Sequence, residues 1–496
     1  MKVRISRDAL LIFLVLLACY AYFLPRWADW NQNSRFDLVR AIVEKGTLAI
    51  DDFAWNTGDY ATVDGHIYSD KAPGLAFAAV PIHFAANAIL HLPFVDSVVQ
   101  RLAAGPAFGD TLKEGSTGLQ IDKVRHALGI LASTFLLVML PSALLGVLIY
   151  SFLGDLNLPR TSRVATPLIY GLATSAFPYS GEFYAHQFAA VFLFAAFYLA
   201  FSMRRGRLGP RAMLPIGFLI SYSVISEYPT ALIGVAISLY AVAAVPNKRW
   251  IAGAIFAGLF PITLWAWHNL VIFGTPIKLG YEYSTLWQSE HSIGFLSLSA
   301  PTLESIWGIT FDSYRGLYFT SPILLMTWPG LYLFWRTRMH RAELVVCGWA
   351  TTSFMLFNAS SAMWQGGFSI GPRYLVPMLP FAAVLLAYGI GGAHRRGWSA
   401  VMAALTAWSL AAIWVETIAG QAFPDYTTNP LFNYSLPKLL AGDVARNLGM
   451  IAGLRNGASL APLAVLVGFL LWQLARERTS QAALPQTPTV AVHESR

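Results

Sequence analysis

Apolar stretches recur along nearly the whole chain and alternate with short polar turns. Many are about 17 to 25 residues long, which lets a helix cross a hydrocarbon layer of about 30 Å. A soluble core would need shorter apolar segments. The pattern therefore predicts an all-α fold, a polytopic transmembrane protein with about 12 or 13 membrane helices and with short helices in its extracytoplasmic loops.

The first apolar stretch, residues 10–24, follows a basic leader at residues 1–7, as in a signal peptide. No small-x-small cleavage site follows it, and residues 25–30 have the composition of an interfacial anchor. We interpret this stretch as a retained first membrane helix.

Short basic turns separate pairs of apolar stretches. They lie at residues 159–163, 204–211, 248–249, 336–341 and 395–396. The positive-inside rule assigns these turns and both termini to the cytoplasm, which predicts a multi-pass protein of the inner membrane. We expect one transmembrane domain over residues 1–475 and a disordered cytoplasmic tail at residues 476–496.

The longer polar loops then lie on the extracytoplasmic face. The first outer loop covers residues 25–72, and later ones cover 177–187, 273–315, 358–374 and 420–455. The alternation fails near the start, because residues 75–92 and 127–152 would be two crossings between an outer loop and an inner one. Either residues 75–92 are re-entrant, or residues 93–125 contain another membrane segment.

The composition of the chain is typical of a membrane protein and argues against nucleic acid as a partner. Hydrophobic residues make up 56% of the chain and charged residues only 12%, against about 25% charged in a typical soluble domain. The net charge of +8 comes largely from arginines in short loops, where they orient helices, so nucleic acid is not expected as a partner. Cys19 and Cys347 both lie in apolar segments, which excludes a disulfide framework and a cysteine metal site.

The densest polar cluster is residues 50–74, with five aspartates directly before an apolar stretch. A carboxylate at the membrane interface has a raised pKa and can accept a proton from a hydroxyl group near neutral pH. Lys71 can hold a lipid phosphate there. The alternatives are a solvated loop and a lysine that snorkels towards water. The candidate catalytic acids here are Asp52, Asp59 and Asp70, and His66 and Tyr68 are candidate substrate contacts.

A second candidate site is the pair Glu182 and His186, four residues apart. If a helix begins near Gly181, the two side chains share one face, with Glu182 as a catalytic acid and His186 as a substrate contact. A metal site would need a third ligand, and none is nearby in the sequence. The alternative is a glutamate that caps the first turn of a helix.

Two arginines, Arg315 and Arg373, lie in outer loops against the charge bias. A guanidinium group there suits a phosphate or pyrophosphate, although plain helix-entry turns rich in glycine and proline are an alternative. Trp364 lies near Arg373 and is a candidate to stack on a sugar, or else to join the interfacial aromatic belt.

The first outer loop resembles the GT-C superfamily of membrane glycosyltransferases, in particular bacterial relatives of protein mannosyltransferases and of the lipid A aminoarabinose transferase. The resemblance rests on residues 33–46, similar to a helical stretch of that family, and on residues 70–74, similar to its entry into the next helix. Elsewhere the likeness is limited to hydropathy and to the two arginine-bearing turns.

The chain departs from the family pattern just before Arg35. The relatives carry an Asp-Glu pair there, whereas this chain has Gln32 and Asn33. Another acid in the loop could substitute, with Asp29, Asp52, Asp59 and Asp70 as the candidates, or transferase activity has been lost.

The resemblance implies transfer of a sugar from a polyprenyl-phosphate donor to an extracytoplasmic lipid, glycan or protein, with inversion at the sugar carbon. A carboxylate would take the acceptor proton, while Lys71, Arg315 and Arg373 would stabilise the departing lipid phosphate. No cofactor is required, and a divalent cation is compatible with the site. The alternatives are a transporter or flippase of lipid-linked saccharide and an inactive assembly subunit in contact with membrane lipids.

Overall fold

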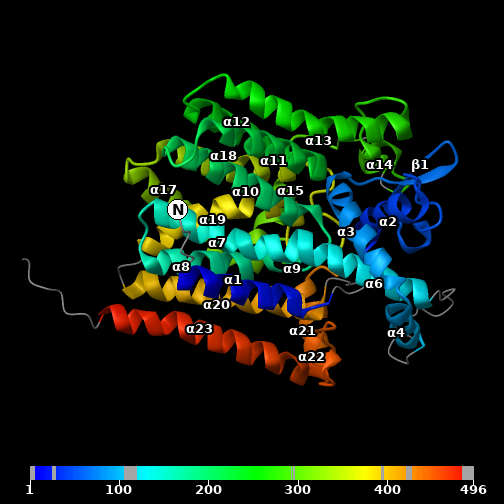
Figure 1. The fold of residues 1–496 in the computed structure, drawn as a ribbon. Helices are drawn as coiled ribbons and strands as arrows, with labels where there is room; N and C mark the ends of the chain where they lie inside the picture. The colour runs from blue at the N-terminus through cyan, green and yellow to red at the C-terminus, as the bar shows by residue number, and fades with distance from the viewer. Residues whose placement is uncertain are drawn as a thin grey trace, which may run out of the picture.

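The computed structural model describes residues 6–24, 29–104, 120–286, 288–291, 293, 297–392, 396–420 and 427–482. Within these ranges the chain is mainly helical (Figure 1). The first half contains α1 (Arg7–Tyr22), α2 (Trp30–Arg40), α3 (Gly74–Leu90), α4 (Pro93–Ala103), α6 (Gln120–Thr134), α7 (Leu140–Asp155), α8 (Arg160–Leu172), α9 (Ala176–Ser180), α10 (Ala185–Arg204), α11 (Met213–Ser226) and α12 (Ala231–Ala244).

The second half contains α13 (Trp250–Phe273), α14 (Gln288–His291), α15 (Leu303–Thr310), α16 (Leu317–Thr320), α17 (Thr327–Arg336), α18 (Arg341–Ser360), α19 (Leu379–Gly391), α20 (Arg396–Ala419), α21 (Leu436–Leu440), α22 (Leu448–Ile451) and α23 (Ala461–Ala482). The predicted tail begins at residue 476, and α23 continues past that point. Residues 483–496 lie outside the described ranges.

Six helices are long and apolar enough to cross a membrane. They cover Asp122–Asp155, Ala185–Arg204, Trp250–Phe273, Arg373–Gly391, Gly397–Ala419 and Asn456–Arg476. A seventh is added if the bent pair α3 and α4 counts as one span. Several other apolar segments form shorter helices, such as α1 with 16 residues and α11 with 14. The chain therefore has the helices of a membrane protein, while the count of 12 or 13 crossings stays a prediction.

The long helices lie side by side and define two ends of the bundle (Figure 1). We call the end that carries α2 and the strands β1 (Tyr60–Val63) and β2 (His66–Ser69) the site end, and the other the opposite end. Basic turns gather at the opposite end, where Arg160 lies 2.6 Å from Asp8 and Arg207 lies 2.7 Å from Asp155. Turns that the sequence assigned to one side of the membrane thus share one end of the fold.

The course of α3 and α4 bears on the uneven number of crossings. α3 begins at the site end, where the Tyr222 hydroxyl donates to the Gly74 carbonyl over 3.0 Å. The continuous helix Asp122–Asp155 also begins there, because Arg40 of α2 lies 2.6 Å from Asp122. Between these two starts, α3 and α4 bend by 88°. The chain leaves and returns at one end, which favours the re-entrant alternative for residues 75–92.

The interior of the bundle is built around α10 and α19, which are buried over most of their length, whereas α13 is mostly exposed. Rings of Phe152, Phe194, Phe197 and Phe381 pack on one another with centroids 5.2 to 6.2 Å apart. α17 approaches α19 closely, since a Cβ on Gly330 would lie 2.0 Å from the Leu385 carbonyl oxygen. Small residues at such crossings permit the tight packing that holds membrane helices together.

Candidate functional site

The hairpin β1–β2 determines the positions of two aspartates in the acidic loop of residues 50–74. Its turn is Asp64 and Gly65, both with positive φ, as the tight turns between antiparallel strands require. Tyr60 pairs with Ser69 in the antiparallel register. The residues just outside that pair, Asp59 and Asp70, therefore emerge next to each other at the base of the hairpin.

Lys71 joins these two acids into a buried cluster. Its Nζ lies 2.9 Å from an Asp59 carboxylate oxygen and 3.0 Å from one of Asp70, and the Ser284 hydroxyl donates to Asp70 over 2.9 Å. Burial raises the pKa of Asp70, although the Lys71 cation opposes this. Burial lowers the pKa of Lys71, but the two carboxylates more than compensate and leave it raised. Lys71 is therefore a permanent cation between two acids. We call these three residues the hairpin triad.

Asp29 stands beside the triad at the start of α2, where its Oδ1 accepts a hydrogen bond of 2.8 Å from the Asn31 backbone amide. Burial raises the pKa of Asp29 to about 6, while Arg373 and Lys71 lower it and Asp59 raises it further. These interactions locate Asp29 between the hairpin triad and Arg373. From the sequence, Asp29 was only one of four candidates to replace the Asp-Glu pair that the resembling glycosyltransferases carry.

Arg373 lies in the segment before α19 and interacts electrostatically with Asp29. It donates to the Tyr184 hydroxyl over 3.4 Å, and its guanidinium lies over the rings of Tyr184 and Tyr374, with centroids 5.5 and 5.3 Å away. Its Nε is buried and has no hydrogen-bond acceptor, and the described part of the chain supplies no carboxylate in an ion pair with it. Gly366 has a φ of 70° and a virtual Cβ 3.2 Å from the Arg373 side chain, so a larger residue would crowd it.

His186 is paired differently from the expectation. α10 begins at Ala185 rather than near Gly181, so Glu182 lies before the helix and does not share a helical face with His186. The expected i,i+4 pair is wrong for this reason. His186 Nδ1 instead lies 2.9 Å from a carboxylate oxygen of Glu227, the residue that ends α11, and its ring stacks on Tyr184. Glu182 lies within electrostatic reach of Tyr179.

Arg315 is fully buried and is bound to backbone. Its guanidinium donates to the carbonyls of Tyr314 over 2.9 Å and Gln365 over 3.0 Å, and also to Gly367. These bonds hold the glycine-rich loop that leads to Arg373. The geometry favours a positioning role, and a direct contact between Arg315 and a lipid phosphate stays a prediction.

Four other predicted residues lie away from the hairpin triad. Asp52 forms an exposed ion pair of 2.9 Å with Lys45, and His66 forms one of 2.8 Å with Asp51. Tyr68 is half-buried on β2. Trp364 packs on α15, since a Cβ on Gly308 would lie 2.2 Å from its ring.

Sequence reasoning missed two charged residues that complete the site. Arg35 is buried in α2 and donates to the Ala72 carbonyl over 2.8 Å, directly after the hairpin triad. Glu227 follows α11 directly and pairs with His186. In the sequence, the only sign that Arg35 and Glu227 have a function was that each charged residue lies beside an apolar stretch.

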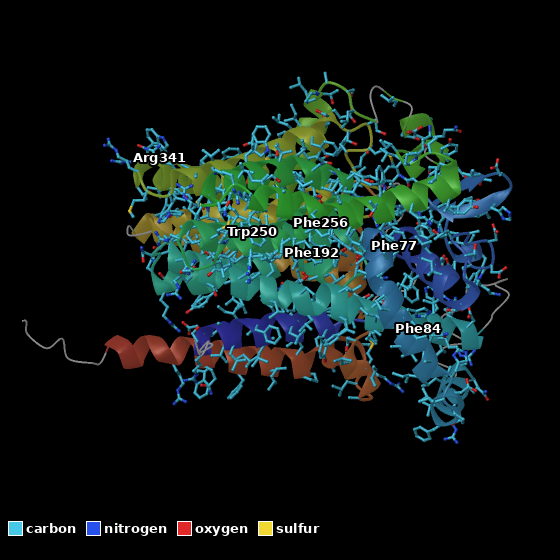
Figure 2. The ribbon with its side chains drawn as sticks, turned by 45° about the horizontal axis from the view of Figure 1, so that its top comes forward. Phe77, Phe84, Phe192, Trp250, Phe256 and Arg341 are labelled. Atoms are coloured by element: carbon cyan, nitrogen blue, oxygen red, sulfur yellow. The ribbon has the colours of Figure 1, made fainter. Side chains whose placement is uncertain are left out.

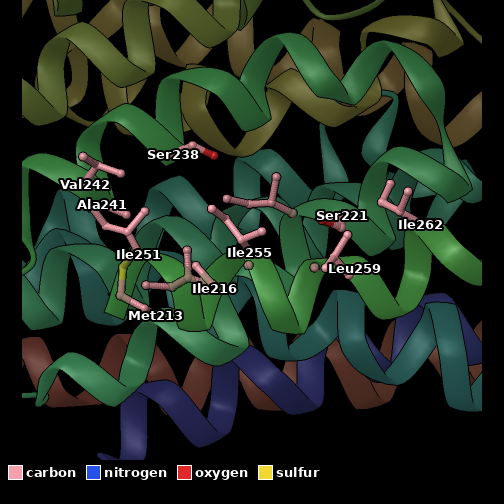
Figure 3. A pocket seen from close by; sticks show the side chains of 14 residues that line it. Met213, Ile216, Ser221, Ser238, Ala241, Val242, Ile251, Ile255, Leu259 and Ile262 are labelled. Carbon is pink, nitrogen blue, oxygen red and sulfur yellow. The ribbon is translucent and has the colours of Figure 1, made fainter. Parts of the chain in front are cut away.

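Two cavities lie elsewhere on the molecule. One, of about 330 Å³, is lined mainly by apolar side chains of α11, α12 and α13 (Figure 3). The other, of about 490 Å³, is lined by Trp335 and three arginines at the opposite end. As for metals, the described residues contain no group of three His, Cys, Asp or Glu side chains suited to an ion.

Comparison with known proteins gives no family for this arrangement. No known protein-family model matches the chain, and no curated protein matches it either.

Proposed function

We propose that the protein is a membrane glycosyltransferase that moves a sugar from a polyprenyl-phosphate donor to an extracytoplasmic acceptor. Support comes from segments far apart in the sequence that bring acids and cations to one end of the bundle. Asp29 comes from the start of α2, the hairpin triad from residues 59–71, and Arg373 from the loop before α19.

The observation that carries the proposal is the state of Arg373. A buried guanidinium without a carboxylate partner is costly, and a phosphate accepts the two parallel hydrogen bonds that a guanidinium fork offers. The buried Nε of Arg373 has no acceptor among the described residues. The phosphate of a lipid-linked sugar would supply one, and Arg373 would stabilise its charge as the bond to the sugar breaks.

Asp29 is the acid best suited to act as the base. Asp59 and Asp70 share the Lys71 cation, whereas Asp29 has a pKa raised to about 6 by burial. Asp29 is then ionised at neutral pH but still basic enough to accept a proton. The acceptor hydroxyl forms a new bond to the sugar carbon and gives its proton to Asp29, while the polyprenyl phosphate leaves from the other face with the bonding electrons.

The test uses the full chain reconstituted in vesicles with a synthetic polyprenyl-phosphate hexose and a membrane extract as the acceptor source. Release of free polyprenyl phosphate is measured. We expect Asp29→Asn to lower the rate by about 10²- to 10⁴-fold, the usual contribution of a general base. Arg373→Gln should also lower it. Asp64→Asn is the matched control, because Asp64 is exposed in the hairpin turn and asparagine tolerates its positive φ.

An unchanged rate in folded Asp29→Asn would remove Asp29 as the base. A wild-type protein that releases no polyprenyl phosphate, with any of several hexoses, would argue against transferase activity as a whole.

The alternative of a transporter or flippase is weaker because of where the charges lie. In the six candidate spans, every Asp, Glu, Lys, Arg and His lies within about six residues of a span end. Transporters usually carry ionisable groups near the bilayer midplane. The same vesicles distinguish the two, since a flippase would move the intact donor between leaflets without releasing polyprenyl phosphate.

A further inference from the structure

A second charged region lies at the opposite end, where a four-residue turn joins α17 to α18. Figure 2 shows Arg341 at that end, far from Phe77 and Phe84 of α3. The cavity of about 490 Å³ there is lined by Trp335, Arg336, Arg338 and Arg341. We call these four residues the arginine pocket. It takes no part in the function proposed above.

The three arginines of the arginine pocket repel one another, and among the described residues only aromatic rings lie against them: Arg336 is 5.8 Å from the Tyr332 ring centroid and Arg341 is 5.5 Å from that of Trp335. None of them forms an ion pair with a carboxylate, and none donates a side-chain hydrogen bond. The nearest acid on α18, Glu343, is buried and accepts a hydrogen bond of 2.6 Å from the Tyr240 hydroxyl, so it is engaged elsewhere. Arg341 also stands in the first turn of the 20-residue α18, where the helix dipole disfavours a cation and favours an anion.

The turn that brings the arginines together is itself constrained. Arg338 and His340 have φ values of 56° and 53°, which side chains other than glycine seldom adopt. The Thr337 hydroxyl donates to the Phe334 carbonyl over 2.7 Å and accepts from the Met339 amide over 3.3 Å, and so fixes the turn. Strain that gathers like charges around a cavity is typical of a binding site rather than of a loop that only connects helices.

Exposed apolar side chains surround the arginine pocket. Tyr332, Trp335 and Met339 expose 55%, 52% and 58% of their surface, beside the ends of apolar helices. Aromatic rings in this position are typical of the headgroup layer of a membrane. A binding site for a soluble anion is expected to have a polar rim. The rim of the arginine pocket is apolar, which favours a lipid as the ligand.

We propose that the arginine pocket binds the phosphate of an anionic phospholipid headgroup in the leaflet at the opposite end. Two or three guanidinium groups would donate to the phosphate oxygens, and Trp335 would rest against the glycerol region. Binding would also relieve the repulsion among the three arginines.

The test measures lipid retention by the full-length protein, purified in neutral detergent with equal amounts of phosphatidylglycerol and phosphatidylcholine, by native mass spectrometry. We expect wild-type protein to retain phosphatidylglycerol with at least about tenfold preference, because each arginine near the headgroups adds to the attraction. The variant with Arg336, Arg338 and Arg341 all replaced by glutamine should lose most of it.

The matched control replaces Arg211, Lys248 and Arg249 by glutamine, which removes three positive charges from other turns at the same end. It should keep the preference. If the triple pocket variant misfolds, Arg338→Gln alone, with an unchanged melting temperature, should lower the preference about threefold. The proposal is wrong if the pocket variants retain phosphatidylglycerol as wild type does, or if the control loses it equally. It is also wrong if millimolar inorganic phosphate displaces the lipid, which would indicate a site for a soluble anion.

Discussion

Two groups of cations, one at each end of the bundle, are held in different ways. At the site end, Lys71 and Arg40 are largely buried, and each is held by two carboxylates, Asp59 and Asp70 for the first and Glu44 and Asp122 for the second. At the opposite end, the three arginines of the arginine pocket are exposed and have no carboxylate partner among the described residues. A cation removed from water needs acids or carbonyl oxygens around it, while an exposed one can rely on water.

Arg373 lies at the site end but, unlike Lys71 and Arg40, forms no ion pair with a carboxylate among the described residues. It lies among buried tyrosines near Asp29, yet its Nε has no acceptor in the part of the chain that the structure describes. Two kinds of charge therefore lie at the site end: those with partners within the fold, and Arg373, whose Nε has no acceptor among the described residues.

The largest expected effect comes from removing the cation of the hairpin triad. Lys71→Met removes the cation that lies between the buried carboxylates of Asp59 and Asp70, and we expect the free energy of unfolding to fall by about 3–5 kcal/mol. Thermal unfolding in detergent measures the loss. Lys71→Met combined with Asp70→Asn should recover part of it, since the repulsion between the two buried carboxylates is then removed. A single variant as stable as wild type would show that the triad is hydrated rather than dry.

A smaller loss of stability should distinguish the replacement of buried Arg315 by lysine from that of exposed Arg336. Lysine cannot reproduce the planar fork with which Arg315 reaches three carbonyls. We expect Arg315→Lys to cost about 2–3 kcal/mol of unfolding free energy, because carbonyls of the glycine-rich loop lose their donors. Arg336→Lys at the opposite end is the control and should leave the unfolding temperature unchanged. Equal effects of the two changes would contradict the comparison.

The pH dependence of Asp29 gives a third test. Burial raises its pKa to about 6 in the folded protein, so the transfer rate should fall about tenfold for each pH unit below that value. A raised pKa also means that Asp29 favours folding at low pH and that this contribution is lost as the pH rises through about 6. Asp29→Asn should therefore be more stable than wild type at pH 8 but not at pH 4. A melting-temperature difference that does not change with pH would contradict the assignment.

The sequence was sufficient to predict that the chain is mainly helical and has apolar helices long enough to cross a membrane. Long apolar stretches indicated membrane helices, and Asp70 and Lys71 were expected to place an acid and a cation at a helix start, as they do before α3. This expectation needed only local patterns, namely periodicity, turn residues and charge. The hairpin β1–β2 was not predicted.

What failed depended on contacts between distant segments. The Glu182 and His186 pair required a helix start four residues earlier than the one observed, and no local pattern announced that Glu227 from another helix would pair with His186. The importance of Asp29 was equally hidden, because its raised pKa comes from burial near Arg373, more than 300 residues away. The bend of 88° between α3 and α4 favours one of the two alternatives that hydropathy left open, and no local pattern announced it.

The smallest expected effect lies at the opposite end and has the opposite sign. Arg338 has a φ of 56° and stands beside two other unpaired arginines. Arg338→Asn removes one repelling charge and introduces a residue that tolerates the left-handed region, so we expect a gain of roughly 0.5 kcal/mol in unfolding free energy. Arg336→Asn is the control, since Arg336 ends α17 in helical geometry and asparagine is the poorer helix former. Chemical denaturation in neutral detergent resolves the two. A loss of stability in Arg338→Asn without lipid would mean that the arginine pocket supports the fold, and the contrast between the hairpin triad and the arginine pocket would then not hold.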